Sequence, residues 1–292
     1  MMNSILKRKN LCLLLSFLLI ALSFAKTNAQ SRYSKEIQAE FSVRKDKIQT
    51  ELSRLQTNEW AGEYNVHGLF LFLAPKAGFA FYMSGGDYDA NWENFLLNYG
   101  TIQFSETKIK LTPELPNKEE VLPSYSTELL PILWDERHYL IPADEVVEFI
   151  NYVNIGYEPS FAFAGLSNHF FLKKGDIEKK VVGKPNIPEQ YRGYLLEKPI
   201  KGKITTIKNS KLEQDGDRQQ RNTEIILNVG KNNGVFEGMK FLIYSPRRIS
   251  ADDVKITKVE DNHSEAIVIQ TYLKEKTPSV GWKVSTSLKD IK

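Results

Sequence analysis

The chain has 292 residues, of which 41% are hydrophobic and 11% aromatic, and this composition excludes a disordered protein. Its 39 Lys and Arg residues exceed its 36 Asp and Glu residues by three, but four of the basic residues lie within the first 29, so the rest of the chain has no basic excess that would favour nucleic acid. One cysteine in the whole chain excludes a disulfide framework.

The first 29 residues have the pattern of a secretory signal peptide. A basic stretch at residues 7–9 precedes an uncharged apolar run at 11–24, and Ala29 places a small residue at the expected cleavage point. The alternative, a membrane anchor, needs roughly 20 apolar residues, so we expect cleavage and no membrane span afterwards. The leader removes Cys12 and four basic residues, which leaves 35 basic and 36 acidic ones. An exported chain of this size without cysteine indicates a bacterial envelope protein, periplasmic or extracellular.

The next residues predict a helix followed by short strands. Apolar residues between Tyr33 and Leu55 recur at steps of three, four and seven, which predicts a charged helix with one apolar stripe. From Trp60 the hydrophobic period changes to two, and Pro- and Gly-containing turns separate the apolar runs. Strands are predicted at residues 60–66, 69–73, 79–83, 101–104, 108–111, 139–141 and near 169–173. Residues 112–142 otherwise read as Pro-rich and mixed, and a helix is predicted from about Asp144 to Gly156.

Two domains follow from these elements. Three prolines mark a linker at residues 183–199. Before it we expect a helix-flanked antiparallel β domain at 31–182, and after it a small β-barrel at 200–292. The strands of this barrel are predicted at 202–208, 223–229, 239–244, 254–260, 264–270 and 282–287. The expected fold class is mainly β (α+β), an N-terminal helix plus an antiparallel sheet or barrel, then a small C-terminal β-barrel.

The stretch NVGKNNGVFEGMKF, residues 228–241, places glycines at 230, 234 and 238 beside Lys231. A phosphate-binding loop needs a lysine and a hydroxyl residue after its last glycine, and a dinucleotide loop needs a following helix. Here a strand pattern follows Gly238. We therefore interpret the stretch as strand–turn chemistry with a positive φ at Gly234, and expect no bound cofactor.

Other candidate sites are weaker. Asp87, Asp89 and Asn91 have the spacing of calcium ligands, but Trp92 stands where the glycine of such a loop belongs, so a polar hairpin loop is the preferred interpretation. The four histidines, at 67, 138, 169 and 263, lack metal-site spacing, and structural roles are expected for them. No residues stand out as catalytic.

Aromatic side chains concentrate in the first β domain and suggest a ligand cavity. An eight-stranded barrel can leave room for a small apolar ligand, but the preferred interpretation is that the same side chains fill a core. The candidate cavity residues are Trp60, Tyr64, Phe72 and Phe81.

Two resemblances rest on particular motifs. The stretch at residues 228–246, together with VKITKVEDNHSEAIVI and GWKVSTS, resembles the small C-terminal β-barrel of the flagellar assembly protein T family and, more loosely, the barrels of rod-shape-determining envelope scaffold proteins. Residues 60–174, with EWAGEY and LAPKAGF, resemble an uncharacterised family of exported bacterial proteins. The matching positions of the first resemblance are Gly230, Gly234, Val235, Gly238, Met239, Ala266 and Gly281.

The leading functional hypothesis is an exported, non-enzymatic envelope protein that acts as a binding or assembly module for another envelope protein or a glycan. The alternative is a carrier of a small apolar ligand in the first β domain. A third hypothesis is a hydrolase whose site is dispersed along the sequence.

Overall fold

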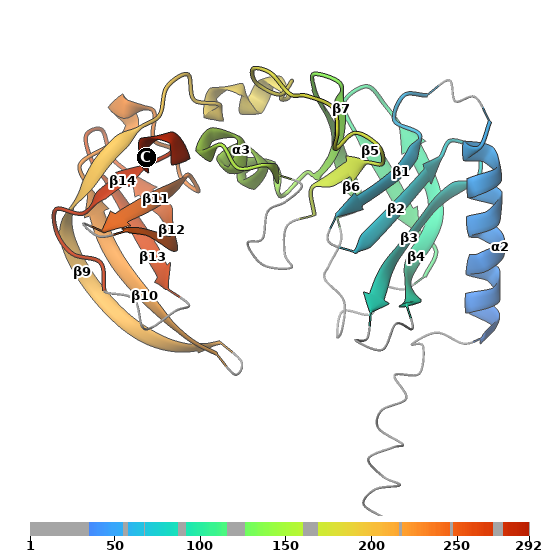
Figure 1. Ribbon diagram of the computed structural model, residues 1–292, viewed down its shortest axis with the longest axis horizontal. Coiled ribbons are helices and arrows are strands. Elements are labelled where there is room, and N and C mark those ends of the chain that lie inside the picture. Colours follow the sequence, from blue (N-terminus) through green and yellow to red (C-terminus); the bar gives the residue numbers. More distant parts are fainter. Residues whose placement is uncertain are drawn as a thin grey trace, which may run out of the picture. The chain divides into compact units, whose positions relative to one another are not determined.

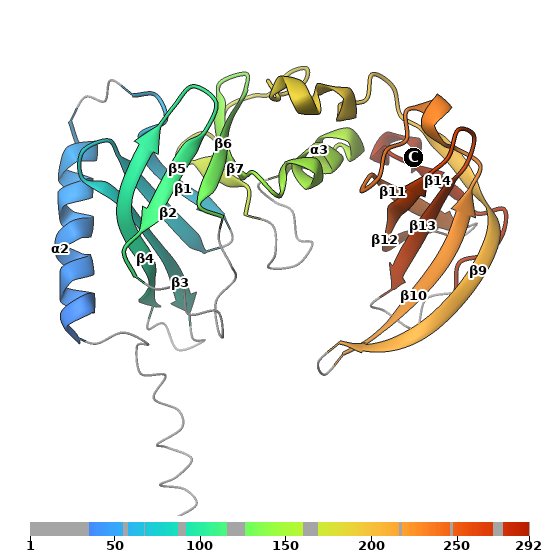
Figure 2. The same cartoon turned by 180° about the vertical axis from the view of Figure 1, so that it is seen from behind.

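The computed structural model describes residues 35–54, 58–66, 68–86, 92–115, 126–159, 169–215, 218–245, 248–270 and 277–291. It is mainly β, with an N-terminal helix, α2 (Lys35–Leu52), an eight-stranded closed antiparallel barrel and a second antiparallel barrel (Figures 1 and 2). The predicted fold class is therefore confirmed. Within the described residues, no helix is both long and apolar enough to cross a bilayer.

The first barrel is a meander in which strands pair in chain order and close between β1 and β8. Alternate residues point inward, so Tyr64, Leu71 and Phe81 share one buried cluster although they lie on three successive strands. Its strands are β1 (Gly62–Val66), β2 (Leu69–Ala74), β3 (Gly78–Gly86), β4 (Trp92–Phe104), β5 (Ile109–Pro113), β6 (Glu128–Trp134), β7 (Arg137–Pro142) and β8 (Phe171–Lys173).

Strand β6 corrects the interpretation of residues 112–142 as Pro-rich and mixed. Pro131 lies within β6, which pairs with β7 from Leu129 to Trp134 but with β5 at only two positions. Proline has no N–H group, and a strand tolerates it where one side of the strand is not fully paired. Strand β4 also begins at Trp92, well before the predicted start at residue 101.

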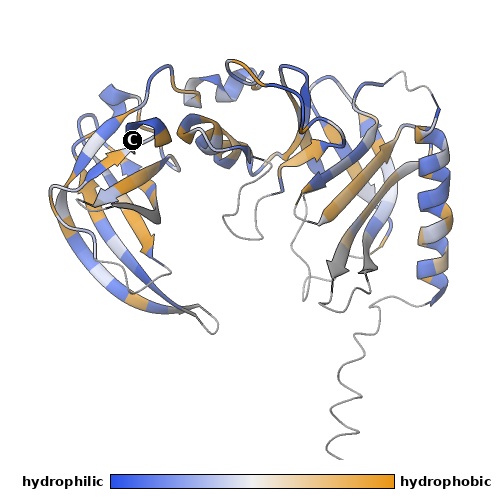
Figure 3. Ribbon diagram, viewed as in Figure 1, coloured by the Kyte–Doolittle hydropathy of each residue, from blue (hydrophilic) through white to orange (hydrophobic). Residues whose placement is uncertain are grey.

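Helices cover the outer faces of this barrel. From Lys45 onward, the end of α2 contacts the turn between β2 and β3: Ile48 is buried, and the Glu51 carboxylate accepts hydrogen bonds from the backbone N–H groups of Lys76 and Ala77 at 3.1 and 2.7 Å. Most of α2 is hydrophilic (Figure 3). Helix α3 (Val146–Ile155) lies against β6 and β7 and ends at Gly156, as the sequence predicts.

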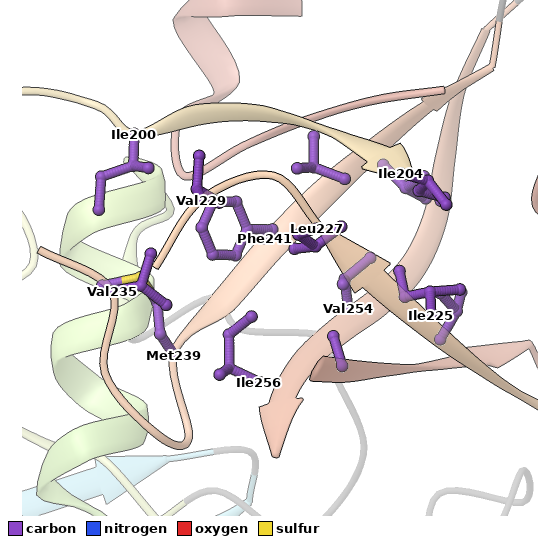
Figure 4. Packing of buried hydrophobic residues seen from close by; sticks show 14 residues of the cluster. Ile200, Ile204, Ile225, Leu227, Val229, Val235, Met239, Phe241, Val254 and Ile256 are labelled. Atoms are coloured by element: carbon purple, nitrogen blue, oxygen red, sulfur yellow. The ribbon is translucent and has the colours of Figure 1, made fainter. Parts of the chain in front are cut away.

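The second barrel has the strand order β10-β13-β12-β11-β14-β9 and closes between β9 and β10. Its core is aliphatic apart from Met239 and Phe241 (Figure 4). Its strands are β9 (Lys201–Asp215), β10 (Arg218–Leu227), β11 (Lys240–Ser245), β12 (Arg248–Val259), β13 (Ser264–Gln270) and β14 (Lys283–Ser285). Short 3-10 helices occur at η2 (Glu189–Tyr194), η3 (Lys231–Asn233) and η4 (Leu288–Ile291).

The glycine-rich stretch at residues 228–241 is a turn, as predicted. Gly234 and Gly238 both have φ of 84°, a left-handed conformation that favours glycine. Gly230 serves a different purpose, because a Cβ atom there would lie 2.2 Å from the carbonyl oxygen of Glu260. The three glycines therefore allow turns and a close backbone approach.

Helix α3 also contacts this turn. The side chain of Asn151, which is 1% exposed, donates to the carbonyl oxygen of Gly238 at 2.9 Å and accepts from the N–H of Lys240 at 3.1 Å. Lys240 forms an ion pair with Glu148 at 2.5 Å. One buried amide thus satisfies two backbone groups at the start of β11.

Candidate functional site

The four predicted cavity residues occupy different surroundings. Tyr64 and Phe81 are fully buried inside the first barrel. Phe72 lies outside that cluster, stacked on Tyr82 with ring centroids 5.6 Å apart. Trp60 is half-buried and packs edge-on against His138 at 5.1 Å. The barrel wall separates Phe72 from the interior pair, so these four residues do not line one cavity.

The calcium candidates Asp87, Asp89 and Asn91 lie outside the described residues. Within the described part of the chain, no three His, Cys, Asp or Glu side chains are grouped to hold a metal ion.

A polar cluster at the β6–β7 hairpin is structural. Arg137, which is 8% exposed, forms an ion pair with Glu158 at 2.7 Å and donates to the carbonyl oxygens of Ile177 and Lys179. Its guanidinium therefore ties β7 to the chain that follows β8, and its hydrogen-bonding groups are used by the protein itself.

Asp176 forms hydrogen bonds with His138, the residue of β7 that follows Arg137. Its carboxylate accepts hydrogen bonds from the backbone N–H and Nδ1 of His138 at 2.7 and 2.8 Å, and it pairs with Lys179 at 2.6 Å. Burial by itself raises the pKa of Asp176, but the hydrogen bonds from Lys179 and His138 outweigh burial and lower it. His138 thus has the structural role expected from the sequence.

The second barrel has an unusual strand edge. Strand β9 pairs with β10 from Ile204 to Asp215, but β14 covers its other side only from Lys201 to Lys203. Both views show β9 and β10 as a long curved hairpin (Figures 1 and 2). Among the described residues, 205–215 of β9 therefore have a partner strand on one side only.

The direction of the unpaired backbone groups follows from the register. The N–H and C=O groups of Ile204 bond away from β10, to residues of the turn before β14. Ile204 of β9 pairs with Leu227 of β10. Every residue of β10 from Leu227 back to Arg221 has a partner on β9, and the partner of Arg221 is Leu212. Leu227 and Arg221 are an even number of residues apart, so the backbone groups of Leu212 also point away from β10. Those of Lys211 point toward β10.

Most of the side chains described along this edge are polar and exposed. Leu212 is 60% exposed, Lys208 pairs with Glu265 at 2.7 Å, and Glu213 accepts a hydrogen bond from Asn222 at 2.6 Å. Lys211 is exposed. Lysines and two register shifts on β9 are features that protect strand edges from uncontrolled association. The edge of β9 at residues 205–215 is our candidate functional site.

A comparison with models of protein families, with curated proteins and with solved structures found no match to this chain. The resemblances described above therefore stay predictions, and the function has to be argued from the geometry.

Sequence reasoning found β9 and β10 but not their length. In sequence, residues 209–222 contain one large apolar residue, Leu212, so they show no apolar period of two that would mark a strand. The DGD turn at 215–217 was the available signal, since it fixes the centre of a hairpin whose strands must then extend toward it.

Proposed function

We propose that the chain is an exported, non-enzymatic binding module of the bacterial envelope that captures an extended segment of another envelope protein by adding it as a strand to β9. The observation that carries this proposal is the one-sided pairing of residues 205–215. A strand edge exposes alternating donors and acceptors, and an extended polypeptide matches them at the spacing of a β-sheet.

A protein partner fits this edge better than a glycan. Residues 205–215 contain no aromatic side chain on which a sugar ring could lie. Their exposed charges are mixed, with Lys211 next to Glu213, so the edge has no strong preference for one sign of charge. Affinity would come from main-chain hydrogen bonds, each contributing about 0.5–1.5 kcal/mol.

The test compares two substitutions at Leu212. Leu212→Pro removes an N–H group that points outward, while the ladder between β9 and β10 keeps its bonds. Leu212→Thr changes the side chain but keeps the N–H group. The mature protein and both variants would be immobilised and exposed to an envelope fraction of the native cells, and retained proteins would be identified by mass spectrometry.

We expect one protein to be retained by the wild type and by Leu212→Thr and to be lost with Leu212→Pro. Equal thermal stability of the two variants would establish that both are folded. Retention of that protein by Leu212→Pro at the wild-type level would refute strand addition. Retained glycan without protein would favour the glycan hypothesis instead.

A further inference from the structure

The end of the β9–β10 hairpin has an edge with a regular backbone pattern (Figures 1 and 2). Both register shifts between β9 and β10 lie before Asn209, so residues 209–215 pair with β10 without interruption. Because outward-pointing groups alternate along a regular strand, Ser210 and Gln214 bond outward as Leu212 does. This part of the edge can therefore pair with a short extended strand along its whole length.

Three consecutive side chains of this edge are exposed and differ in chemistry. Lys211 has no ion pair among the described residues. Glu213 accepts a hydrogen bond from Asn222 of the same hairpin at 2.6 Å, and a carboxylate can accept more than one. Leu212, which is 60% exposed, lies on the opposite face of the strand from these two charges. The edge thus presents both signs of charge on one face and a leucine on the other.

A second strand of the same sequence, running antiparallel, complements this pattern. When two copies pair about a two-fold axis at Leu212, each Leu212 faces the other, and each Lys211 faces Glu213 of the other copy. Ser210 then faces Gln214 of the other copy, so every residue that bonds outward meets another that does so. This pairing satisfies the backbone groups and the charges at the same time.

Other registers of the same two strands are less favourable. A shift by one residue sets outward-pointing backbone groups against groups that point toward β10. A shift by two sets Lys211 against Lys211 or Glu213 against Glu213, and like charges directly opposite each other destabilise a strand pair. The charge pattern therefore selects the register that is centred on Leu212.

We propose that a second copy of this chain pairs with residues 209–215 of β9 in an antiparallel, two-fold symmetric dimer. Its regulatory meaning rests on the proposed function, because the dimer covers the same edge and the captured envelope protein must displace the second copy. The contact is small, so the dimer is weak, with a dissociation constant on the order of 0.1–1 mM. At micromolar concentration the edge is free for capture.

Charge exchange tests this register in solution. Sedimentation equilibrium of the mature protein at low salt, from about 0.02 to 1 mM, measures the dissociation constant. Lys211→Glu turns both Lys–Glu pairs of the symmetric dimer into Glu–Glu pairs, and Glu213→Lys turns both into Lys–Lys pairs. We expect either variant to weaken the dimer about tenfold, and an equimolar mixture of the two variants to dimerise about as tightly as the wild type.

Two further variants serve as controls. Lys203→Glu changes the net charge equally, but this exposed lysine lies where β14 already covers β9, so the dimer should be unchanged. The double exchange Lys211→Glu/Glu213→Lys should dimerise like the wild type, and it tests the pairing within one chain should a single variant fail to fold. A monomeric wild type, single variants that dimerise normally, or a mixture that is not restored would each overturn the proposal.

Failure of the self-pairing is distinguishable from failure of strand capture. A wild type that stays monomeric, but loses its envelope partner through Leu212→Pro, overturns the self-pairing and leaves the proposed function in place. A dimer with the expected charge dependence, in a protein that retains no envelope protein, supports the self-pairing and counts against the proposed function instead.

Discussion

Replacing Asn151 by alanine tests how α3 is attached to the start of β11. The substitution removes two hydrogen bonds, to the carbonyl oxygen of Gly238 and from the N–H of Lys240, at a side chain that is 1% exposed. Each buried bond contributes about 1–1.5 kcal/mol net, which gives about 2–3 kcal/mol for the two. Alanine has a higher helix propensity than asparagine, which offsets about 0.5 kcal/mol of this loss in the free energy of unfolding. The expected loss is therefore about 2 kcal/mol.

Urea unfolding followed by circular dichroism measures this loss as a lower midpoint with an unchanged slope. Asn154→Ala is the matched control, since Asn154 is a half-buried residue of the same helix that donates to the carbonyl oxygen of Tyr194 at 2.9 Å and accepts from the N–H of Leu196 at 3.0 Å. Its hydrogen-bonding partners are more accessible to water, so we expect Asn154→Ala to lower the free energy of unfolding by less. A loss below about 0.5 kcal/mol for Asn151→Ala would refute the reasoning, because it would mean that the two backbone groups find other partners.

Two further predictions concern local geometry and pH. Gly230→Ala places a Cβ 2.2 Å from the carbonyl oxygen of Glu260 and should destabilise the protein by about 3 kcal/mol. Gly234→Ala is strained only by the φ of 84° and should destabilise it by about 1 kcal/mol. Thermal unfolding that ranks the two variants in the opposite order would contradict this prediction. The lowered pKa of Asp176 means that its carboxylate stabilises the fold above its ordinary pKa near 3.9, and that this stability is lost as the pH falls through the lower folded value. Asp176→Asn should therefore be less stable than the wild type at pH 7 and should lose less stability between pH 5 and pH 2; parallel stability–pH curves would disprove the assignment.

The sequence predicts those parts of the fold in which strand residues are buried, on one face or on both. The runs around Leu71 and Phe81 are apolar at every position, because one face of each strand points into the barrel and the other is also largely buried. The six strands of the second barrel are all predicted by the sequence. Strand β6 was missed because Pro131 interrupts its pattern, and its incomplete pairing with β5 is a tertiary feature that no local pattern records.

The candidate sites were much harder to predict. The free edge of β9 depends on β14 being short, and β14 is separated from β9 by most of the second barrel in sequence. Likewise, the sequence does not show that His169 is paired with Glu145, whose carboxylate oxygen lies 3.0 Å from its Nδ1. Sequence spacing shows neither partner, because both contacts cross between distant segments.

Residue-resolved amide hydrogen exchange tests the central claim most directly, because the claim is that one side of β9 is unpaired. In the free protein, the account predicts that the N–H of Leu212 exchanges at least about 100-fold faster than that of Lys211, which bonds to β10, and that Leu212 becomes protected once the captured partner is added. Equal, strong protection of both amides in the free protein would show that the edge is already covered, and would contradict strand addition at β9.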